Sequence, residues 1–314
     1  MRFSTPISLA APAKVNLTLA VGPPSPPRGY HPIASHFHCI DLCDDLTLTA
    51  MPDWPASRIE LDVAWAADAL KPSAIDWPAD KDLAVRAMAA AAARLRLEHG
   101  VAIKLRKRIP TGGGLGGGSA DAGAVLRLCQ LVLERNGGES AADAGWMVEA
   151  AASLGSDVAF FADPVGTAGS VAPRPAIVEG FGERHRRIER SHGYLVLIFP
   201  PFGCATPAVY RAFDSAVGHT LDTDRVVRSA AGLAGQPIAD GTLFNDLAAA
   251  AMHVAPRLAE IAAAAAAIAH QPVHVSGSGS TLFLIAGRDA EAAGQLATKV
   301  FRATGCPAVA VRLV

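Results

Sequence analysis

A run of glycines dominates the middle of the chain. Between Gly112 and Gly118, in the stretch TGGGLGGGSADAG, six residues are glycine and one is leucine. Glycine weakens helices and strands, but it takes positive φ freely and lets the backbone approach a ligand closely. After the run, apolar residues recur at i, i+3, i+4 and i+7, which is typical of an amphipathic helix. The sequence therefore predicts a loop followed at once by a helix that begins near Ser119, its expected cap, and ends before Asn136.

The junction of this loop with the helix is suited to bind an anion. Unpaired N–H groups at a helix N-terminus and the positive end of the helix dipole attract phosphate groups. Lys107 precedes the loop and falls on the apolar parity of an expected strand at 101–109. Either its charged end leaves the core at the end of the strand, or it supplies a positive charge to a bound phosphate, and the sequence leaves both open.

Three other interpretations of the glycine run are less consistent with the sequence. A Walker A loop requires a lysine before the serine, and here Gly118 precedes Ser119. Gly112, Gly114 and Gly117 match the GxGxxG pattern of a dinucleotide-binding loop, but that loop usually opens its fold, whereas this one follows several expected strands. A flexible linker is disfavoured because a strongly amphipathic helix follows immediately.

Composition limits the class of protein. The chain has 314 residues, which favours two domains, and its 51% of hydrophobic residues is sufficient for a large core. A formal net charge of −1 gives no reason to expect nucleic acid or an anionic membrane as a partner. The five cysteines show no zinc spacing, and the broken apolar run around Pro6 makes a weak signal peptide. We therefore expect a soluble cytoplasmic protein, a monomer or a weak homodimer.

Periodicity predicts the remaining elements. Alternating or continuous apolar residues predict strands, and helical spacing predicts helices. We expect strands at 13–21, 46–50, 58–63, 101–109, 194–199 and 308–313, and helices at 83–97, 142–154, 207–215, 243–252, 256–270 and 290–303. A segment rich in Pro, Gly and small residues at 163–175 is a candidate junction between domains. His36 and His38, which flank Phe37, are interpreted as structural or solvent-exposed.

Four motifs in order carry a resemblance to a known family. PTGGGLGGGS (Pro110–Ser119) resembles the ATP loop of the GHMP superfamily, named after galactokinase, homoserine kinase, mevalonate kinase and phosphomevalonate kinase. The other three motifs are APAKVNLTLAV (Ala11–Val21), LGSDVAFF (Leu154–Phe161) and SGSGSTLF (Ser276–Phe283). The resemblance implies a two-domain, α+β GHMP-kinase-like fold with the active site in the cleft between the domains. An ATP-binding, ribosomal-S5-domain-2-like α/β domain would span 1–165, and a ferredoxin-like α+β domain 166–314.

The resemblance also implies which residues bind ATP and catalyse phosphoryl transfer. Asp157 would be the base that orients or deprotonates the acceptor hydroxyl, and Lys14 would keep Asp157 ionised and stabilise the transferring charge. ATP would contact Lys107, Pro110, Gly112, Gly113, Gly114, Leu115, Gly116, Gly117, Gly118 and Ser119, and the Ser119 hydroxyl would assist a Mg²⁺ ion on the phosphates. Without the resemblance, Asp157 would be the N-cap of a short helix and Lys14 a surface residue of an edge strand.

Two further segments indicate the acceptor. GYHPI (Gly29–Ile33) and ATPAVY (Ala205–Tyr210) resemble the branch that phosphorylates the 2-hydroxyl of a methylerythritol linked to cytidine diphosphate, in the non-mevalonate isoprenoid pathway. We therefore expect a kinase that uses ATP and Mg²⁺ on this small molecule. The alternatives are a GHMP-type kinase for a mevalonate- or homoserine-like alcohol, an NAD-binding oxidoreductase and an inactive nucleotide-binding regulator.

The same resemblance implies the substrate contacts. Tyr30 and His31 would hold and stack the cytosine, and Asn16, Thr206 and Tyr210 would also contact the substrate. Tyr210 is open to a second interpretation, as ordinary packing of a helix. The chain departs from the usual residues of the family at Arg28, at Asp82, where the family residue contacts adenine, at Ala120, at Ala159 and in the segment Ala66–Asp80.

Overall fold

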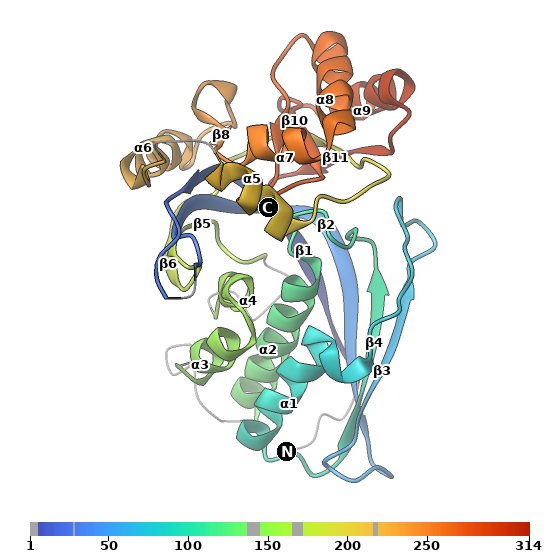
Figure 1. Ribbon diagram of the computed structural model, residues 1–314. Helices are drawn as coiled ribbons and strands as arrows, with labels where there is room; N and C mark the ends of the chain where they lie inside the picture. The colour runs from blue at the N-terminus through green and yellow to red at the C-terminus, as the bar shows by residue number, and fades with distance from the viewer. Residues whose placement is uncertain (1–5, 28, 137–144, 165–171, 216–218) are drawn as a thin grey trace. The chain divides into compact units, whose positions relative to one another are not determined.

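The computed structural model describes residues 6–27, 29–136, 145–164, 172–215 and 219–314 (Figure 1). The chain divides into two compact units. Unit 1 comprises Met1–Ala13, Leu42–Thr111 and Gly116–Pro173, and unit 2 comprises Lys14–Asp41, Gly112–Leu115 and Arg174–Val314. Strands β1 (Ile7–Val21) and β2 (Ile33–Met51) each contribute one part to each unit. The expected boundary between 165 and 166 lies outside the described residues, so the domain limits 1–165 and 166–314 stay a prediction.

The sheet of unit 1 is built around β4 (Gly100–Lys107). This strand runs parallel to β3 (Ile59–Trp65) and antiparallel to the second part of β2, where Asp45 pairs with Arg106. Val101, Ile103 and Leu105 are buried and alternate with more exposed residues, because successive side chains of a strand point to opposite faces. Lys107 takes the next buried position of this series.

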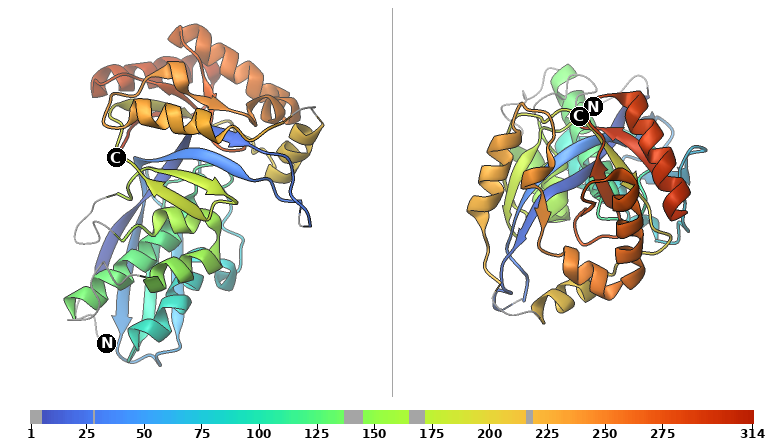
Figure 2. Two further views of the ribbon diagram at one scale, coloured as in Figure 1. Left: turned by 90° about the vertical axis from the view of Figure 1, so that its left-hand side faces the viewer. Right: turned by 90° about the horizontal axis from the view of Figure 1, so that it is seen from above.

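Helices cover one side of these strands in unit 1 (Figures 1 and 2). They are α1 (Leu83–Leu95), preceded by the short helix η1 (Ala79–Lys81), α2 (Gly117–Arg135), α3 (Gly145–Leu154) and α4 (Ser156–Phe161). Most of α2 is buried, as expected for a helix that packs against a sheet and other helices. A Cβ atom at Gly123 would lie 2.4 Å from the Cβ of Phe161, so only glycine allows α2 and α4 to approach this closely.

In unit 2, the remaining parts of β1 and β2 pair with three further strands of the same seven-stranded sheet. The first residues of β2 pair with β5 (Ala176–Gly180), and β5 pairs with β6 (Arg184–Arg187). Strand β1 runs parallel to β8 (Phe244–Asn245), which follows the short helix η3 (Asp240–Thr242). Helix α6 (Thr223–Leu233) contributes Val226 and Ala230 to a buried apolar cluster with Ala20, Ala34 and Ile177.

A four-stranded antiparallel sheet forms the rest of unit 2. Its order is β11 (Ala308–Arg312), β7 (Tyr194–Ile198), β10 (Leu282–Ile285) and β9 (His274–Val275). Helices α5 (Thr206–Asp214), α7 (Ala248–Val254), α8 (Pro256–Ala269) and α9 (Ala290–Thr304) form one large apolar cluster with this sheet, to which the end of β1 also contributes. Val196 and Leu282 represent the buried face of the sheet in that cluster.

Most elements expected from periodicity are confirmed, with limits that shift by a few residues. The helix expected at 243–252 is wrong at its start, because Phe244–Asn245 pairs with β1 and the helix begins only at Ala248. The expected start of a helix at Ala142 lies outside the described residues. Strands β5, β6 and β8 and helix α6 were not expected. His36 and His38 are fully buried in β2, so the solvent-exposed interpretation is wrong.

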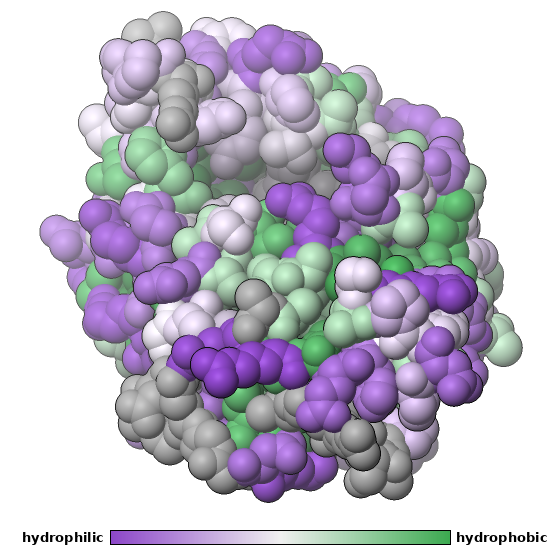
Figure 3. All heavy atoms as spheres, turned by 90° about the horizontal axis from the view of Figure 1, so that it is seen from below, coloured by the Kyte–Doolittle hydropathy of each residue, from purple (hydrophilic) through white to green (hydrophobic). Residues whose placement is uncertain are grey.

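The surface shown in Figure 3 mixes hydrophilic and hydrophobic residues. Large apolar side chains that are exposed in unit 1 include Leu70 and Val148. Among the described residues, no single helix is long and apolar enough to cross a membrane. Helices α7 and α8 reach the length and apolar composition of such a helix only when they are taken together, and the chain bends by 120° between them.

Candidate active site

The glycine loop leads directly into α2, but the helix begins earlier than expected. Gly116, with φ of 71°, is the N-cap, and no side chain caps this end, so the interpretation of Ser119 as the cap is wrong. The backbone N–H of Ala120 makes the first bond of the helix ladder, to Gly116 O at 2.8 Å. The N–H groups of Gly117, Gly118 and Ser119 therefore lie ahead of the ladder, at the positive end of the helix, where an anion is stabilised.

The first half of the glycine loop, which belongs to unit 2, is held by a second loop that starts at Ser276. Ser276 Oγ donates to Gly114 O at 3.2 Å and accepts from Asn16 N at 3.3 Å. Gly114 has φ of +76°, and a Cβ there would lie 2.3 Å from Ser276 O. Asn245 Nδ2 donates to Val275 O and to a neighbouring carbonyl, which supports the Ser276 loop. The two glycine motifs of the sequence are therefore packed backbone against backbone.

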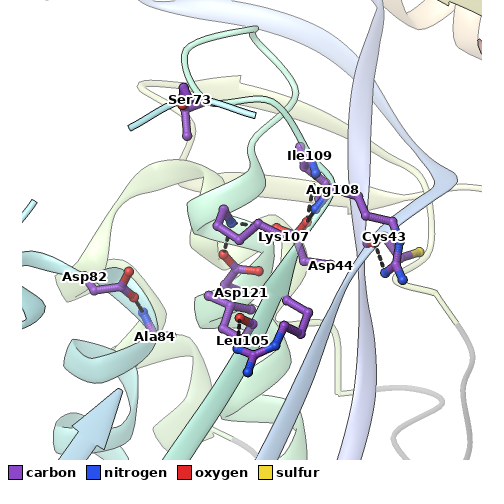
Figure 4. A network of polar contacts seen from close by, with 12 residues as sticks. Cys43, Asp44, Ser73, Asp82, Ala84, Leu105, Lys107, Arg108, Ile109 and Asp121 are labelled. Carbon is purple, nitrogen blue, oxygen red and sulfur yellow. Dashed lines mark hydrogen bonds and ion pairs between the residues drawn. The ribbon is translucent and has the colours of Figure 1, made fainter. Parts of the chain in front are cut away.

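Lys107 lies between two buried carboxylates in unit 1. Figure 4 shows Lys107, Asp44 and Asp121 pointing toward one another from β4, β2 and α2. Lys107 Nζ donates to Asp44 Oδ2 and to Asp121 Oδ2, each at 2.6 Å, and its side chain is 3% exposed. Its charged end does not leave the core, so that interpretation is wrong. Burial alone would lower the pKa of Lys107, but the two carboxylates raise it, while burial raises the pKa of Asp121.

Asp44 also binds the backbone at the end of β4. Its Oδ1 accepts the N–H of Ile109 at 2.8 Å and the N–H of Arg108. Asp44 and Asp121 were both missed by sequence reasoning, although a signal existed. A lysine on the buried parity of a strand needs a charged partner, because an isolated buried charge is very costly.

Lys14 is buried in unit 2, with 4% of the residue exposed. Its Nζ donates to Asn16 Oδ1 at 2.7 Å and lies 4.5 Å from the ring centroid of Phe37, a cation–π distance. Asn16 Nδ2 in turn donates to Ser35 Oγ at 2.9 Å. Because β1 lies between β2 and β8, the interpretation of Lys14 as a surface residue of an edge strand is wrong.

Asp157 lies in the first turn of α4, in unit 1. The N-cap of α4 is Gly155, and no side chain caps it, so the interpretation of Asp157 as the cap is wrong. A carboxylate in this position has the chemistry of a general base toward a hydroxyl group.

The expected substrate residues all lie in unit 2. His31 lies against Tyr210, with ring centroids 4.8 Å apart, and Tyr30, the preceding residue in the sequence, is 62% exposed. Thr206 Oγ1 makes a 2.8 Å hydrogen bond with Ser278 Oγ. An imidazole that lies against an aromatic ring, next in sequence to an exposed tyrosine, is suited to bind a flat base.

Asp214 is a further residue of this group that sequence reasoning missed. His31 Nε2 lies 2.7 Å from Asp214 Oδ1, and the carboxylate is 38% exposed. Asp214 ends α5 and follows Tyr210 by four residues, so both lie on one face of the helix. This helical spacing was the signal that could have associated Asp214 with Tyr210.

The segment 66–80 borders the start of the glycine loop in unit 1. Ser73 Oγ makes a 2.9 Å hydrogen bond with Thr111 Oγ1. At the end of the segment, Asp82 is the N-cap of α1 and accepts from Ala84 N at 2.8 Å and from Trp77 Nε1 at 2.9 Å. Both carboxylate oxygens of Asp82 therefore have protein partners. Among the described residues no group of three or more His, Cys, Asp or Glu side chains is arranged to hold a metal ion.

Comparison with known proteins identifies the class. Residues 82–163 match the family model described as GHMP kinases N terminal domain. The mevalonate kinase of Methanococcus jannaschii superposes with a TM-score of 0.63 over 100% of both chains, and at 14% identity this likeness shows the fold alone. The fold is therefore the α+β fold of the GHMP kinases, as expected from the motifs.

Curated relatives identify the branch. Proteins named 4-diphosphocytidyl-2-C-methyl-D-erythritol kinase are 33% identical in Streptomyces coelicolor, over 95% of this chain and 93% of that protein, and 34% identical in Thermobifida fusca, over 97% and 94%. A crystal structure of 4-(cytidine 5'-diphospho)-2C-methyl-D-erythritol kinase matches with a TM-score of 0.72 and 29% identity, over 98% of this chain and 99% of that one. The chain belongs to the 4-diphosphocytidyl-2-C-methyl-D-erythritol kinase family. It is therefore an ATP-dependent kinase, and nothing supports an oxidoreductase.

Proposed function

We propose that the protein transfers the γ-phosphoryl group of ATP to the 2-hydroxyl of 4-diphosphocytidyl-2-C-methyl-D-erythritol, in the cytoplasm, as a step of the non-mevalonate isoprenoid pathway. The observation that carries the proposal beyond the family name is the contact of His31 with Tyr210, next in sequence to the exposed Tyr30. A mevalonate- or homoserine-like alcohol has no base to occupy such a group. We further propose that the protein is a monomer or a weak homodimer.

The nucleotide half of the proposal uses the glycine loop. The phosphates of ATP would lie against the N–H groups of Gly117, Gly118 and Ser119, with the loop residues from Pro110 to Gly116 around them. In this half of the proposal, Lys107 supplies a positive charge to the phosphates of ATP. Mg²⁺ usually binds through substrate phosphates and only one or two protein oxygens, and Ser119 places one hydroxyl in the first turn of α2. The residues therefore fit a Mg²⁺ ion, which would neutralise phosphate charge.

The chemical step is assigned to Asp157 and Lys14. The Asp157 carboxylate would accept the proton of the 2-hydroxyl while the hydroxyl oxygen bonds to the γ-phosphorus, and the bond from that phosphorus to the β-phosphate oxygen breaks. Lys14 would stabilise the charge on the transferring group. The contact of Lys14 with Asn16 supports this role because it fixes the direction of a long side chain.

The acceptor half uses unit 2. Tyr30 and Tyr210 would stack on the cytosine, and His31 would hydrogen-bond its polar edge. Asn16 and Thr206 would bind the remainder of the substrate. The 2.7 Å contact of His31 with Asp214 supports a fixed imidazole in this role.

The test is a panel of acceptors with the purified protein and ATP–Mg²⁺. We expect turnover of the cytidine-linked methylerythritol, and much weaker turnover of the free methylerythritol phosphate, mevalonate and homoserine. A matched acceptor carrying uridine diphosphate tests the base separately. Turnover of mevalonate or homoserine without turnover of the cytidine compound would overturn the proposal.

A further inference from the structure

The two ends of the glycine loop lie close together within unit 1. The chain enters the loop after Ile109 and leaves it at Gly117. A Cβ atom at Gly117 would lie 3.0 Å from Ile109 Cγ2, so the entry and the exit are in van der Waals contact. The conformation of the loop between them therefore depends on what holds β4 and α2 together at this point.

One buried carboxylate is connected to both ends. At the entry, Asp44 Oδ1 accepts the N–H of Ile109 at 2.8 Å and the N–H of Arg108. At the exit, Lys107 Nζ joins Asp44 Oδ2 to Asp121 Oδ2 of α2, with both distances 2.6 Å (Figure 4). Asp121 lies four residues after Gly117, so it is fixed to the first turns of the helix.

The charge of Lys107 is engaged by the protein. Its side chain is 3% exposed, and those of Asp44 and Asp121 are 0% and 3% exposed. Two hydrogen-bonded carboxyl groups already face its ammonium group, so a phosphate nearby would have to compete with both of them. This arrangement suits a structural tie better than a phosphate ligand.

We propose that Asp44 is a positioning residue for ATP. Through Lys107 and Asp121, Asp44 clamps the two ends of the glycine loop together. This deepens the nucleotide half of the proposed function. It changes the proposed role of Lys107 from a direct phosphate contact to the bridging member of the clamp.

The experiment compares ATP–Mg²⁺ binding, by titration calorimetry without an acceptor, in Asp44→Asn, Lys107→Met and the double variant. If the clamp positions the loop, both single variants weaken ATP binding by between ~10-fold and ~100-fold, and the double variant is no weaker than the worse single one. Lys107→Arg retains two donors for two carboxylates and should recover most of the affinity. If Lys107 contacts phosphate directly, Asp44→Asn releases its charge, and ATP binding stays equal or tightens while Lys107→Met weakens it. That result would overturn the proposal.

Asp45→Asn is the matched control. Asp45 is the next residue along β2. Its Oδ2 forms an ion pair with Nη1 of Arg108 at 2.8 Å, but its side chain is 58% exposed. We expect unchanged ATP affinity in this variant. If Asp45→Asn weakens binding as much as Asp44→Asn does, the effect is one of general charge and the clamp is refuted.

A second readout does not depend on nucleotide. Amide hydrogen exchange of residues 112–119 in the free protein should be faster in Asp44→Asn and Lys107→Met than in wild type, and unchanged in Asp45→Asn. If Asp44→Asn does not fold, Asp121→Asn keeps the Asp44–Lys107 pair and should show an intermediate loss of protection. Unchanged exchange in these variants would refute the clamp. Failure of the acceptor panel with ATP binding intact would refute the proposed substrate and leave the clamp standing.

Discussion

Gly123 of α2 lies directly against Phe161 of α4, and a Cβ on Gly123 would be 2.4 Å from the Cβ of Phe161. Because α4 carries Asp157, this contact sets how close the proposed base lies to the helix that follows the glycine loop. Gly123→Ala should push the two helices apart, destabilise the protein by about 1–3 kcal/mol and lower kcat. Urea unfolding and steady-state rates measure the two effects.

Gly294 provides the control for Gly123. It lies in α9, and a Cβ there would meet nothing within 4 Å. Gly294→Ala should therefore leave kcat unchanged and stabilise the protein by up to about 1 kcal/mol, since alanine favours helices. Equal stability losses in the two variants would show that the approach of α2 to α4 is not close.

Asp157→Asn should fold normally and lose kcat by about 10²–10⁴-fold. Normal folding is expected because the N-cap of α4 is Gly155 and no side chain caps that end. Thermal unfolding and steady-state kinetics on the cytidine substrate check both halves. Ser156→Ala, at the preceding exposed residue, should match wild type. A rate near wild type for Asp157→Asn would remove this residue as the base.

Gly112→Ala and Gly114→Ala separate backbone strain from close packing. Both glycines have positive φ, 67° and 76°, which costs an alanine about 1–2 kcal/mol. At Gly112 a Cβ would meet nothing within 4 Å, whereas at Gly114 it would lie 2.3 Å from Ser276 O. Gly114→Ala should therefore show the greater rise in KM for ATP and the greater loss of stability. Equal effects in the two variants would contradict the contact with Ser276.

Asp214→Ala should raise KM for the cytidine substrate by about tenfold, the value of one charge-assisted hydrogen bond. The reason is that His31 would lose its partner at 2.7 Å and with it a fixed ring orientation. KM for ATP should not change. Asp224→Ala, which removes another exposed carboxylate of unit 2, is the control. A rise in the KM values of both substrates would indicate a general loss of structure.

Acid should destabilise the fold through two buried histidines. Burial lowers the pKa of His36 from 6.5 to about 3 and that of His38 from 6.5 to about 4. Between these values and 6.5 the unfolded chain binds protons that the folded chain does not, so the free energy of unfolding falls as pH falls. The slope is up to about 1.4 kcal/mol per pH unit for each histidine.

His36→Leu tests this slope. Within the described part of the chain, neither ring nitrogen of His36 has a hydrogen-bond partner, so leucine removes a titrating group without breaking such a bond. Between pH 7 and pH 5 the free energy of unfolding, measured with urea, should fall by about 2 kcal/mol less in the variant than in wild type. The same pH dependence as in wild type would mean that His36 is protonated in the folded state.

Local patterns predicted the elements that position the site. The glycine run and the apolar spacing after it fix a loop and a helix, because both depend on residues close in sequence. The predicted start of α2 at Ser119 was wrong by two residues. Serine is a better N-cap by residue type, but Gly116 takes the N-cap position here, with φ of 71°.

Partners of buried polar groups were beyond local patterns. The sequence marks Lys107 as unusual, but Asp44 is 63 residues away, and only the pairing of β2 with β4 brings them together. Asp214 is likewise 183 residues from His31. The sequence can show that a buried charge needs a partner, but the identity of that partner depends on the tertiary fold.

The hydrogen bond between Ser276 and Gly114 spans 162 positions of the chain. Proteins are synthesised at about 5–20 residues per second, so Ser276 leaves the ribosome roughly 8–32 s after Gly114. Until then the growing polypeptide has neither the serine hydroxyl nor the backbone against which Gly114 packs. The nucleotide loop thus takes its final shape only after the segment with Ser276 has been made, and a nascent chain that has exposed only the glycine loop has no finished site to offer ATP.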